Sequence, residues 1–277
     1  METLKAYIKI TRPENVLITF LTVYVACIYG SGLYYLNTFL IASLIAALVA
    51  AAGNVINDYF DIQTDKINRP NRPLANGLIT LRGALIFYWL LNIIAFAFAF
   101  YLNTTSLIIV FITIFLLNAY SCCFKKILFL PNITIAFLTG LAFVFGTAAV
   151  GNIKESYIPF VFAFMINLIR EILKDIEDIS GDIIKGDISI PLRYGVDKSV
   201  KIIIVLSIIL MLLTFIPFIF QIYKIEYTII IMLIFNPILF YVSYLIKKNT
   251  NIRNLNKLSI LLKLDMVIGL IVLFFGK

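Results

Sequence analysis

The stretch VINDYFDIQTD, residues 55–65, decides how this sequence is interpreted. It follows a run of apolar and small residues, 39–53, and it places Asp58, Asp61 and Asp65 at the end of that run. A charged carboxylate within hydrocarbon costs about 3 kcal/mol unless a cation or a polar cavity compensates it. If the run crosses a membrane, three such groups indicate a functional site.

The composition indicates a membrane protein with an all-α fold. Of the 277 residues, 62% are hydrophobic and 14% are charged, whereas a soluble domain has about 45–50% apolar and about 25% charged residues. Apolar runs long enough to cross about 30 Å of hydrocarbon recur along the chain. We therefore expect one domain, 1–277, with about nine transmembrane helices around a central cavity. The expected spans are 15–33, 38–57, 82–102, 105–121, 131–150, 156–173, 198–220, 226–246 and 257–275.

The basic residues predict the orientation of the chain in the membrane. With nine spans, all but three of the 23 Lys and Arg residues fall on the side of the N-terminus, the exceptions being Lys154, Lys224 and Lys277. Basic residues favour the cytoplasmic side, so we expect a multi-pass protein of the cell membrane with a cytoplasmic N-terminus. Orientation and contact with anionic lipid explain the net charge of +8, and no nucleic-acid partner is needed.

The absence of histidine limits the chemistry that the chain can perform. It excludes His-based acid–base catalysis and most transition-metal sites. The three cysteines include no C-x-x-C spacing, so structural zinc is not expected. Oxygen ligands dominate, and the natural cofactor for them is a hard cation such as Mg²⁺.

The pattern x-D-x-x-D-x-x-x-D occurs twice. NDYFDIQTD at 57–65 is matched by KDIEDISGD at 174–182, and each aspartate of the second copy follows its counterpart by 117 residues. This repetition predicts two four-helix halves, 1–125 and 126–246, followed by a ninth helix at 257–275.

Helical geometry gathers the aspartates of each copy on one side of a helix. At about 100° per residue, the three aspartates of a copy fall within an arc of roughly 60°. Carboxylates so close together repel one another unless they are protonated or neutralised. Two such stripes facing one cavity would suit two Mg²⁺ ions that clamp a diphosphate, with basic residues neutralising the remaining phosphate charge. The expected catalytic residues and metal ligands are Asp58, Asp61, Asp65, Asp175, Asp178 and Asp182, joined in the metal site by Asn57.

These residues resemble the UbiA superfamily of intramembrane prenyltransferases. NDYFDIQTDKINRPNRPLANGLIT, 57–80, matches the family's N-D-x-x-D-x-x-x-D motif and its downstream N-R-P-x-R-P, and KDIEDISGD matches its looser second motif. The nine-helix layout extends the resemblance over essentially the whole chain. It implies a Mg²⁺-dependent enzyme that transfers a prenyl group from its diphosphate, with the active site on the cytoplasmic side.

Two further segments resemble the family at positions that would bind substrate. YSCCFKK, 120–126, resembles its Tyr-then-Lys segment between the fourth and fifth helices, and RPENVLIT, 12–19, resembles the Arg-Pro segment that opens the first helix. Orientation in the membrane would also account for these basic residues. The expected substrate-binding residues are Arg12, Asn15, Lys66, Arg69, Arg72, Lys125, Lys126, Lys174 and Arg193.

The segment REILKDIEDISGD, 170–182, bears on the acceptor, because it resembles the archaeal branch that makes digeranylgeranylglyceryl phosphate. The resemblance implies transfer of a geranylgeranyl group from geranylgeranyl diphosphate to the free hydroxyl of geranylgeranylglyceryl phosphate, in archaeal ether-lipid synthesis. The acceptor's phosphate would need additional cations. The candidates for that role are Arg69, Arg72, Lys126, Lys185 and Arg193.

Two alternatives stay open at this point. Other members of the superfamily prenylate an aromatic acceptor in quinone, haem or chlorophyll pathways. An ion-coupled transporter would also combine duplicated halves with ionisable residues inside the membrane. Carriers usually hold those residues near the bilayer midplane, whereas both acidic motifs are expected at the cytoplasmic ends of helices, which favours the enzyme.

Overall fold

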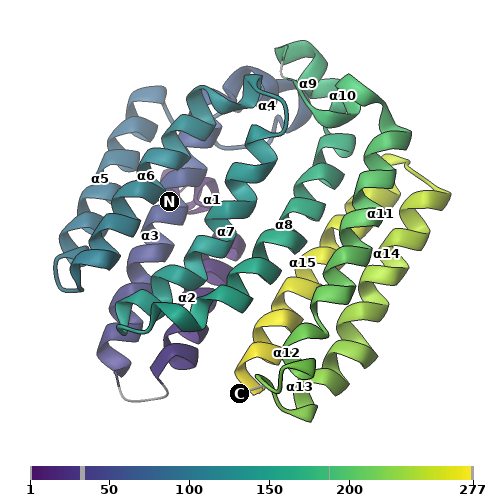
Figure 1. Ribbon diagram of the computed structural model, residues 1–277. Coiled ribbons are helices and arrows are strands. Elements are labelled where there is room, and N and C mark those ends of the chain that lie inside the picture. The colour runs from purple at the N-terminus through teal and green to yellow at the C-terminus, as the bar shows by residue number, and fades with distance from the viewer. Residues whose placement is uncertain (1, 32–34, 187, 276–277) are drawn as a thin grey trace. The chain divides into compact units, whose positions relative to one another are not determined.

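The computed structural model describes residues 2–31, 35–186 and 188–275, and within them it contains helices and no strand (Figure 1). The expected all-α fold is confirmed. The end of the first predicted span, residues 32–33, lies outside the described residues.

Eight helical stretches in the described part of the chain are long and apolar enough to cross a membrane. They match the first eight predicted spans to within a few residues, and the two spans predicted closest together are separate helices. The eight are α2 (Pro13–Ser31), α3 (Leu36–Phe60), α5 (Leu81–Ala99), α6 (Thr104–Cys122), α7 (Leu130–Ala149), η2 with α8 (Ile153–Ser156 and Tyr157–Glu177), α11 with α12 (Val196–Leu213 and Ile216–Ile219), and α13, the π-helix η3 and α14 (Ile225–Ile230, Ile231–Phe235 and Asn236–Lys248).

The predicted ninth span coincides with the helix α15 (Ile252–Phe275), which is not among those eight. Its passage across the membrane stays a prediction. The remaining elements are short, and two of them, α4 and α9, contain the last aspartate of each acidic motif. The short elements are α1 (Glu2–Ile10), α4 (Ile62–Asn68), η1 (Phe124–Lys126), α9 (Ile179–Lys185) and α10 (Ile190–Tyr194).

The chain forms two compact units, each made of segments that are distant in sequence. Unit 1 comprises Met1–Ile127, Leu141–Ser156 and Ser180–Asp187, and unit 2 comprises Leu128–Gly140, Tyr157–Ile179 and Ile188–Lys277. The helix α7 therefore contributes its first part to unit 2 and its second part to unit 1. The predicted repeat halves stay a prediction.

In unit 1, the helix α3 is the central element, and α1, α2, α5 and α6 pack around it. Its contact positions are small: Ala42 and Ala52 are fully buried, and Gly53 faces the side chain of Leu117. Between membrane helices, small residues allow close backbone approach and therefore more van der Waals contact. This packing fixes the end of α3, where the first acidic motif begins.

In unit 2, α8 packs against α11 and α15, and α14 packs against the same two helices (Figure 1). The contact face of α15 is formed by residues one helical turn apart, including the fully buried Leu258 and Leu262. The second acidic motif begins at the end of α8, so packing against α11 and α15 positions this copy.

The backbone itself repeats at the separation that relates the two acidic motifs. The helix α2 begins 117 residues before α7, α3 ends 117 residues before α8 ends, and α4 and α9 begin and end 117 residues apart. The residues that precede α2 and α7, Arg12 and Phe129, have positive φ angles of 54° and 66°, which are uncommon for residues other than glycine. The repetition therefore extends from the sequence motif to the local conformation.

Close packing of α7 on α2 in unit 1 gives a test of the fold. A Cβ atom at Gly146 would lie 2.6 Å from Ala26 Cβ and 2.8 Å from the carbonyl oxygen of Val23. We expect Gly146→Ala to lower the free energy of unfolding by about 1–3 kcal/mol, since the two helix backbones must separate. Thermal unfolding of the purified protein in detergent measures this. The matched control is Gly269→Ala on α15, where the nearest atom lies at 3.6 Å; equal midpoints for the two variants would contradict the packing.

Candidate active site

The first acidic motif spans the junction of α3 and α4. The helix α3 ends at Phe60, and Asp61 separates it from α4 with φ −90° and ψ 4°. The spacing of the aspartates predicts one continuous helix, and the structure interrupts that helix at Asp61. The hydrogen bonds nevertheless keep helical spacing across the junction: the Asp61 N–H donates to the Asn57 carbonyl at 2.9 Å, and the Asp65 N–H donates to the Asp61 carbonyl at 2.8 Å.

Two arginines neutralise the buried aspartates of this motif. Asp58 is only 2% exposed, and its Oδ1 accepts from Arg12 Nη2 at 2.5 Å and from Arg72 Nη1 at 2.9 Å. The same Nη1 of Arg72 lies 2.5 Å from Oδ2 of Asp65, which is also buried. Arg72 therefore bridges two carboxylates, as expected for a cation that compensates buried charge.

Lys125, in η1, neutralises the third aspartate. Its Nζ lies 2.5 Å from Asp61 Oδ2 and donates to Asn57 Oδ1 at 2.8 Å, while Asn57 Nδ2 donates to Asp61 Oδ2 at 3.0 Å. The ammonium also lies 5.1 Å from the centre of the Tyr120 ring, within the range of a cation–π contact. Asn57, Asp61 and Lys125 thus form one hydrogen-bonded group.

The loop between α1 and α2 holds Arg12 in a strained conformation. Arg12 has φ 54°, and its neighbour Pro13 begins α2. A non-glycine residue in this region costs of the order of 1–3 kcal/mol. Asn54 Nδ2 donates to the Thr11 carbonyl at 2.8 Å and so ties the loop to α3. The strain is found at the residue whose guanidinium contacts Asp58.

The pKa of Asp65, which lies outside the membrane spans, reflects both its burial and the charges around it. Burial raises the pKa of Asp65 above its ordinary value; the Arg72 guanidinium lowers it, and the nearby Asp58 and Asp61 raise it again. The single bridging arginine does not fully offset burial. A further cation near these carboxylates would stabilise their ionised forms.

The second acidic motif spans the junction of α8 and α9 in the same way. The Asp178 N–H donates to the Lys174 carbonyl at 2.9 Å, the counterpart of the Asp61 bond in the first copy. Asp175 Oδ2 accepts from Asn132 Nδ2 at 2.8 Å. Asp175 and Asp178 belong to unit 2, whereas Asp182, on α9, belongs to a segment of unit 1.

The other predicted substrate-binding residues lie on the surface or pair locally. Lys174 Nζ lies 2.7 Å from Glu171 Oε1. The side chain of Lys185 lies outside the described residues. The predicted residues with exposed side chains are Asn15, Lys66, Arg69, Lys126 and Arg193.

The acidic and sulfur side chains that the structure describes do not form a complete metal cage by themselves. Within the described residues, no group of three or more His, Cys, Asp or Glu side chains converges closely enough to hold a metal ion. The structure brings the first motif together with Arg12, Arg72 and Lys125, and it brings Asp175 together with Asn132. Any ion here would need ligands beyond these side chains.

Two residues near the second motif, Asn132 and Arg170, were not predicted from the sequence. Asn132 contacts Asp175, and it follows Asn15 by the repeat separation of 117, which is a signal that could have identified it. Arg170 is a charged residue inside the span Ile153–Glu177, and such residues usually have a function.

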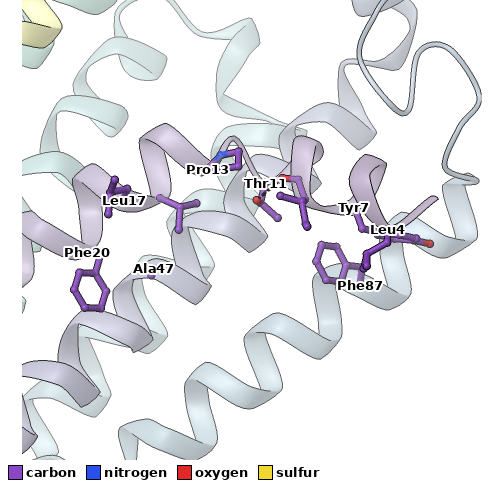
Figure 2. A pocket seen from close by; sticks show the side chains of 10 residues that line it. Leu4, Tyr7, Thr11, Pro13, Leu17, Phe20, Ala47 and Phe87 are labelled. Carbon is purple, nitrogen blue, oxygen red and sulfur yellow. Dashed lines mark hydrogen bonds between the residues drawn. The ribbon is translucent and has the colours of Figure 1, made fainter. Parts of the chain in front are cut away.

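An apolar groove of about 510 Å³ lies beside the loop of Arg12 (Figure 2). It is formed by α1, α2, α3 and α5 of unit 1, and residues such as Leu17, Phe20 and Phe87 line it. Thr11 and Pro13, on either side of Arg12, also line it, and no charged residue does. The groove is therefore separate from the cluster of carboxylates and cations.

Comparison with known proteins identifies the family. The model of the UbiA prenyltransferase family matches residues 16–264. A relative from Methanosphaera stadtmanae, named digeranylgeranylglyceryl phosphate synthase, is 35% identical over 265 residues, which cover 96% of both chains. The chain belongs to the UbiA prenyltransferase family, and it is a multi-pass membrane protein.

Solved structures agree with this assignment. A structure described as giving insights into "Digeranylgeranylglyceryl phosphate synthase in membranes" is 34% identical, with a TM-score of 0.80, and the match covers 100% of this chain and 99% of that chain. A UbiA homolog from Archaeoglobus fulgidus bound to GPP and Mg²⁺ has a TM-score of 0.75 and 21% identity, covering 97% and 99%, and shows the same fold.

The bridging role of Arg72 predicts a large effect on stability. We expect Arg72→Gln to cost about 3 kcal/mol at neutral pH, because it leaves buried carboxylate charge uncompensated. The loss should be smaller at low pH, since protonation of Asp65, whose pKa burial already raises, removes that charge. Thermal unfolding across a pH series measures both effects.

The same experiment has two controls. Arg82→Gln removes an exposed arginine of α5 and should change the midpoint little. The double variant Arg72→Gln/Asp65→Asn should recover part of the loss, since it removes both partners of the 2.5 Å contact. A double variant less stable than Arg72→Gln alone would show that Arg72 does not act through Asp65.

Proposed function

We propose that this protein transfers a geranylgeranyl group from geranylgeranyl diphosphate to the free hydroxyl of geranylgeranylglyceryl phosphate, a step of archaeal ether-lipid synthesis. The proposal is supported by the relative named digeranylgeranylglyceryl phosphate synthase, which aligns over nearly the whole chain. The observation that carries the chemistry is the cluster in which three aspartates of one motif contact Arg12, Arg72 and Lys125.

The carboxylates of the first motif lie beside the cations of Arg12, Arg72 and Lys125. Carboxylates can bind a metal ion, and the cations can bind the diphosphate. In the proposed enzyme, Arg72 and Lys125 exchange part of their carboxylate contacts for phosphate oxygens. Arginine binds two such oxygens through its planar fork, and lysine provides a compact charge. Both cations already contact the motif, so little reorganisation is needed when the diphosphate binds.

The donor atoms of the site suit Mg²⁺. Carboxylate and amide oxygens are the ligands that this hard cation prefers, and it typically takes one or two carboxylates together with waters and phosphate oxygens. That requirement agrees with a site in which the described side chains form no complete cage. Bound Mg²⁺ would neutralise charge on the diphosphate. The residues that would hold it are Asn57, Asp58, Asp61, Asp65, Asp175, Asp178 and Asp182.

The chain's own residues then assist bond cleavage by stabilising charge. The bond between C1 of the prenyl group and the diphosphate oxygen breaks, and negative charge grows on the diphosphate beside Lys125 and Arg72. Positive charge grows on the allylic C1, which the acceptor hydroxyl attacks, forming the new C–O bond and releasing its proton. The absence of histidine from the sequence is compatible with this route, because the departing group is stabilised by charge.

The proposal includes the side of the membrane on which the reaction occurs. All but three of the Lys and Arg residues fall on the side of the N-terminus when nine spans are counted, and such residues favour the cytoplasm. The acidic motifs, at the ends of α3 and α8, would then face the compartment in which water-soluble diphosphates and Mg²⁺ are available.

A product assay tests the function. Purified protein in lipid nanodiscs receives geranylgeranyl diphosphate and Mg²⁺, with geranylgeranylglyceryl phosphate or 4-hydroxybenzoate in separate reactions. We expect a diether phosphate, detected by mass spectrometry, and its loss on addition of EDTA. We expect Asp61→Asn to lower the rate at least about 100-fold, while Asp197→Asn, at an exposed position on α11, keeps the wild-type rate.

The alternative outcomes are distinct. Prenylated benzoate as the sole product would keep the metal-dependent chemistry and reject the ether-lipid acceptor. A diether product that forms at the same rate in EDTA would reject the metal site.

A further inference from the structure

The second copy of the acidic motif carries a charged cluster that the first copy lacks. Arg170, Glu171 and Lys174 lie on α8 just before Asp175, and the positions 117 residues earlier carry no charge. Those positions are Gly53, Asn54 and Asn57. In the proposed function, the aspartates common to both copies serve the diphosphate. The charges found in one copy alone therefore require a separate explanation.

The cluster has a net positive charge and an unused donor. Glu171 Oε1 lies 2.7 Å from Lys174 Nζ and 3.4 Å from Arg170 Nη1, so two cations share one carboxylate. Nε of Arg170 is buried, and it has no hydrogen-bond partner among the described residues. Leaving a buried donor unpaired costs about 1–3 kcal/mol. An anion placed against this guanidinium would remove that cost.

The position of Arg170 adds a second cost that a ligand would offset. Its side chain is 18% exposed, and it lies within the span Ile153–Glu177. An arginine inside a membrane span costs about 2.5–3.5 kcal/mol on insertion scales, and such residues usually line a polar path or bind a substrate. Among the described residues, the acidic side chain paired with Arg170 is Glu171 and not an aspartate of the second motif.

Helix geometry separates Arg170 from the aspartates of the second motif, which are proposed to serve the diphosphate. Arg170 and Lys174 lie about 40° apart around α8, and Arg170 lies about 7.5 Å before Asp175 along the helix axis, towards the interior of the span. Glycerol has three carbons, so the phosphate of a glycerol-lipid acceptor lies only a few bonds from its reacting hydroxyl. The separation of about 7.5 Å between Arg170 and Asp175 along α8 would allow Arg170 to hold the acceptor's phosphate while the acceptor's hydroxyl attacks C1 of the prenyl diphosphate.

We infer that Arg170, together with Lys174, binds the phosphate group of the glycerol-lipid acceptor and gives the enzyme its preference for a phosphorylated acceptor. Nε and Nη2 form the side-on fork that arginine uses to bind two phosphate oxygens, while Nη1 lies towards Glu171. The inference rests on the proposed function for the identity of the acceptor. It assigns the acceptor's phosphate to residues other than the five cations that the sequence suggested for that role.

The test compares a phosphorylated lipid with its dephosphorylated analogue. Binding of geranylgeranylglyceryl phosphate and of geranylgeranylglycerol to the full-length protein in zwitterionic nanodiscs is measured without prenyl diphosphate. We expect Arg170→Gln to weaken binding of the phosphorylated lipid about 10- to 100-fold and to leave binding of the alcohol unchanged. Arg170→Lys, which keeps the charge but loses the fork, should lie between the two.

Two controls distinguish binding from folding. Arg253→Gln removes an exposed arginine of α15 in the same unit, and its affinity for both lipids should equal that of the wild type. The affinity for geranylgeranyl diphosphate with Mg²⁺ should be unchanged in Arg170→Gln, which also shows that this variant is folded. An equal loss of affinity for the diphosphate and for the acceptor would overturn the inference.

Failure of the inference differs from failure of the proposed function. If Arg170→Gln binds both lipids as the wild type does, while the wild type makes the diether, the function stands and this assignment is wrong. If the wild type makes no diether, but Arg170→Gln selectively loses the phosphorylated lipid, the assignment stands and the proposed reaction is wrong.

Discussion

The neutralisation of three aspartates at the end of an apolar helix is the interaction on which the rest of unit 1 depends. Asp58 and Asp65 are buried, and the ionised form of either would be costly without a partner. Their partners come from two loops far apart in the sequence, through Arg12 and Arg72, while Lys125 of η1 reaches Asp61. The three contacts fix the conformation of those segments relative to α3.

The same contacts explain why the site can bind a charged substrate. A cluster of balanced carboxylates and cations can exchange internal ion pairs for contacts with a metal and a diphosphate, since both partners are already in place. The strained backbone of Arg12 is compatible with this role, because strain persists where the surrounding structure requires a particular geometry.

Comparison of the two copies of the acidic motif distinguishes features common to both from residues found in one copy alone. Both copies interrupt a helix at the second aspartate and form the same backbone hydrogen bond there. The copies differ in their partners: Asp58 is paired with arginines, whereas Asp175 accepts a hydrogen bond from the amide of Asn132. Arg170, Glu171 and Lys174 occur in the second copy alone, which is where we place recognition of the acceptor.

The sequence predicted the features that depend on local pattern. Spans follow from hydrophobic length, and the first eight were located to within a few residues. Arg12, Arg72 and Lys125 were expected near the substrate, but the sequence could not specify which aspartate each contacts, because those contacts depend on packing between distant segments. The helix break at Asp61 was missed, since the aspartates keep helical spacing across it.

The sequence also did not identify residues whose role is evident only from the side chains that they contact. Asn132 is one asparagine among many until its contact with Asp175 is seen. Lys125 and Lys126 are equivalent candidates in the sequence, and the structure shows that Lys125 contacts Asp61 whereas Lys126 is exposed. A buried hydrogen-bond donor without a partner, such as Arg170 Nε, is evident only when the surrounding side chains have been placed.

Anomalous diffraction from Mn²⁺, in crystals grown with a non-reactive analogue of geranylgeranyl diphosphate, tests the central claim most directly. The account predicts an anomalous peak about 2.0–2.3 Å from a carboxylate oxygen of Asp58, Asp61 or Asp65, with Lys125 or Arg72 in contact with the diphosphate. A well-ordered diphosphate without a metal peak at these aspartates would contradict it.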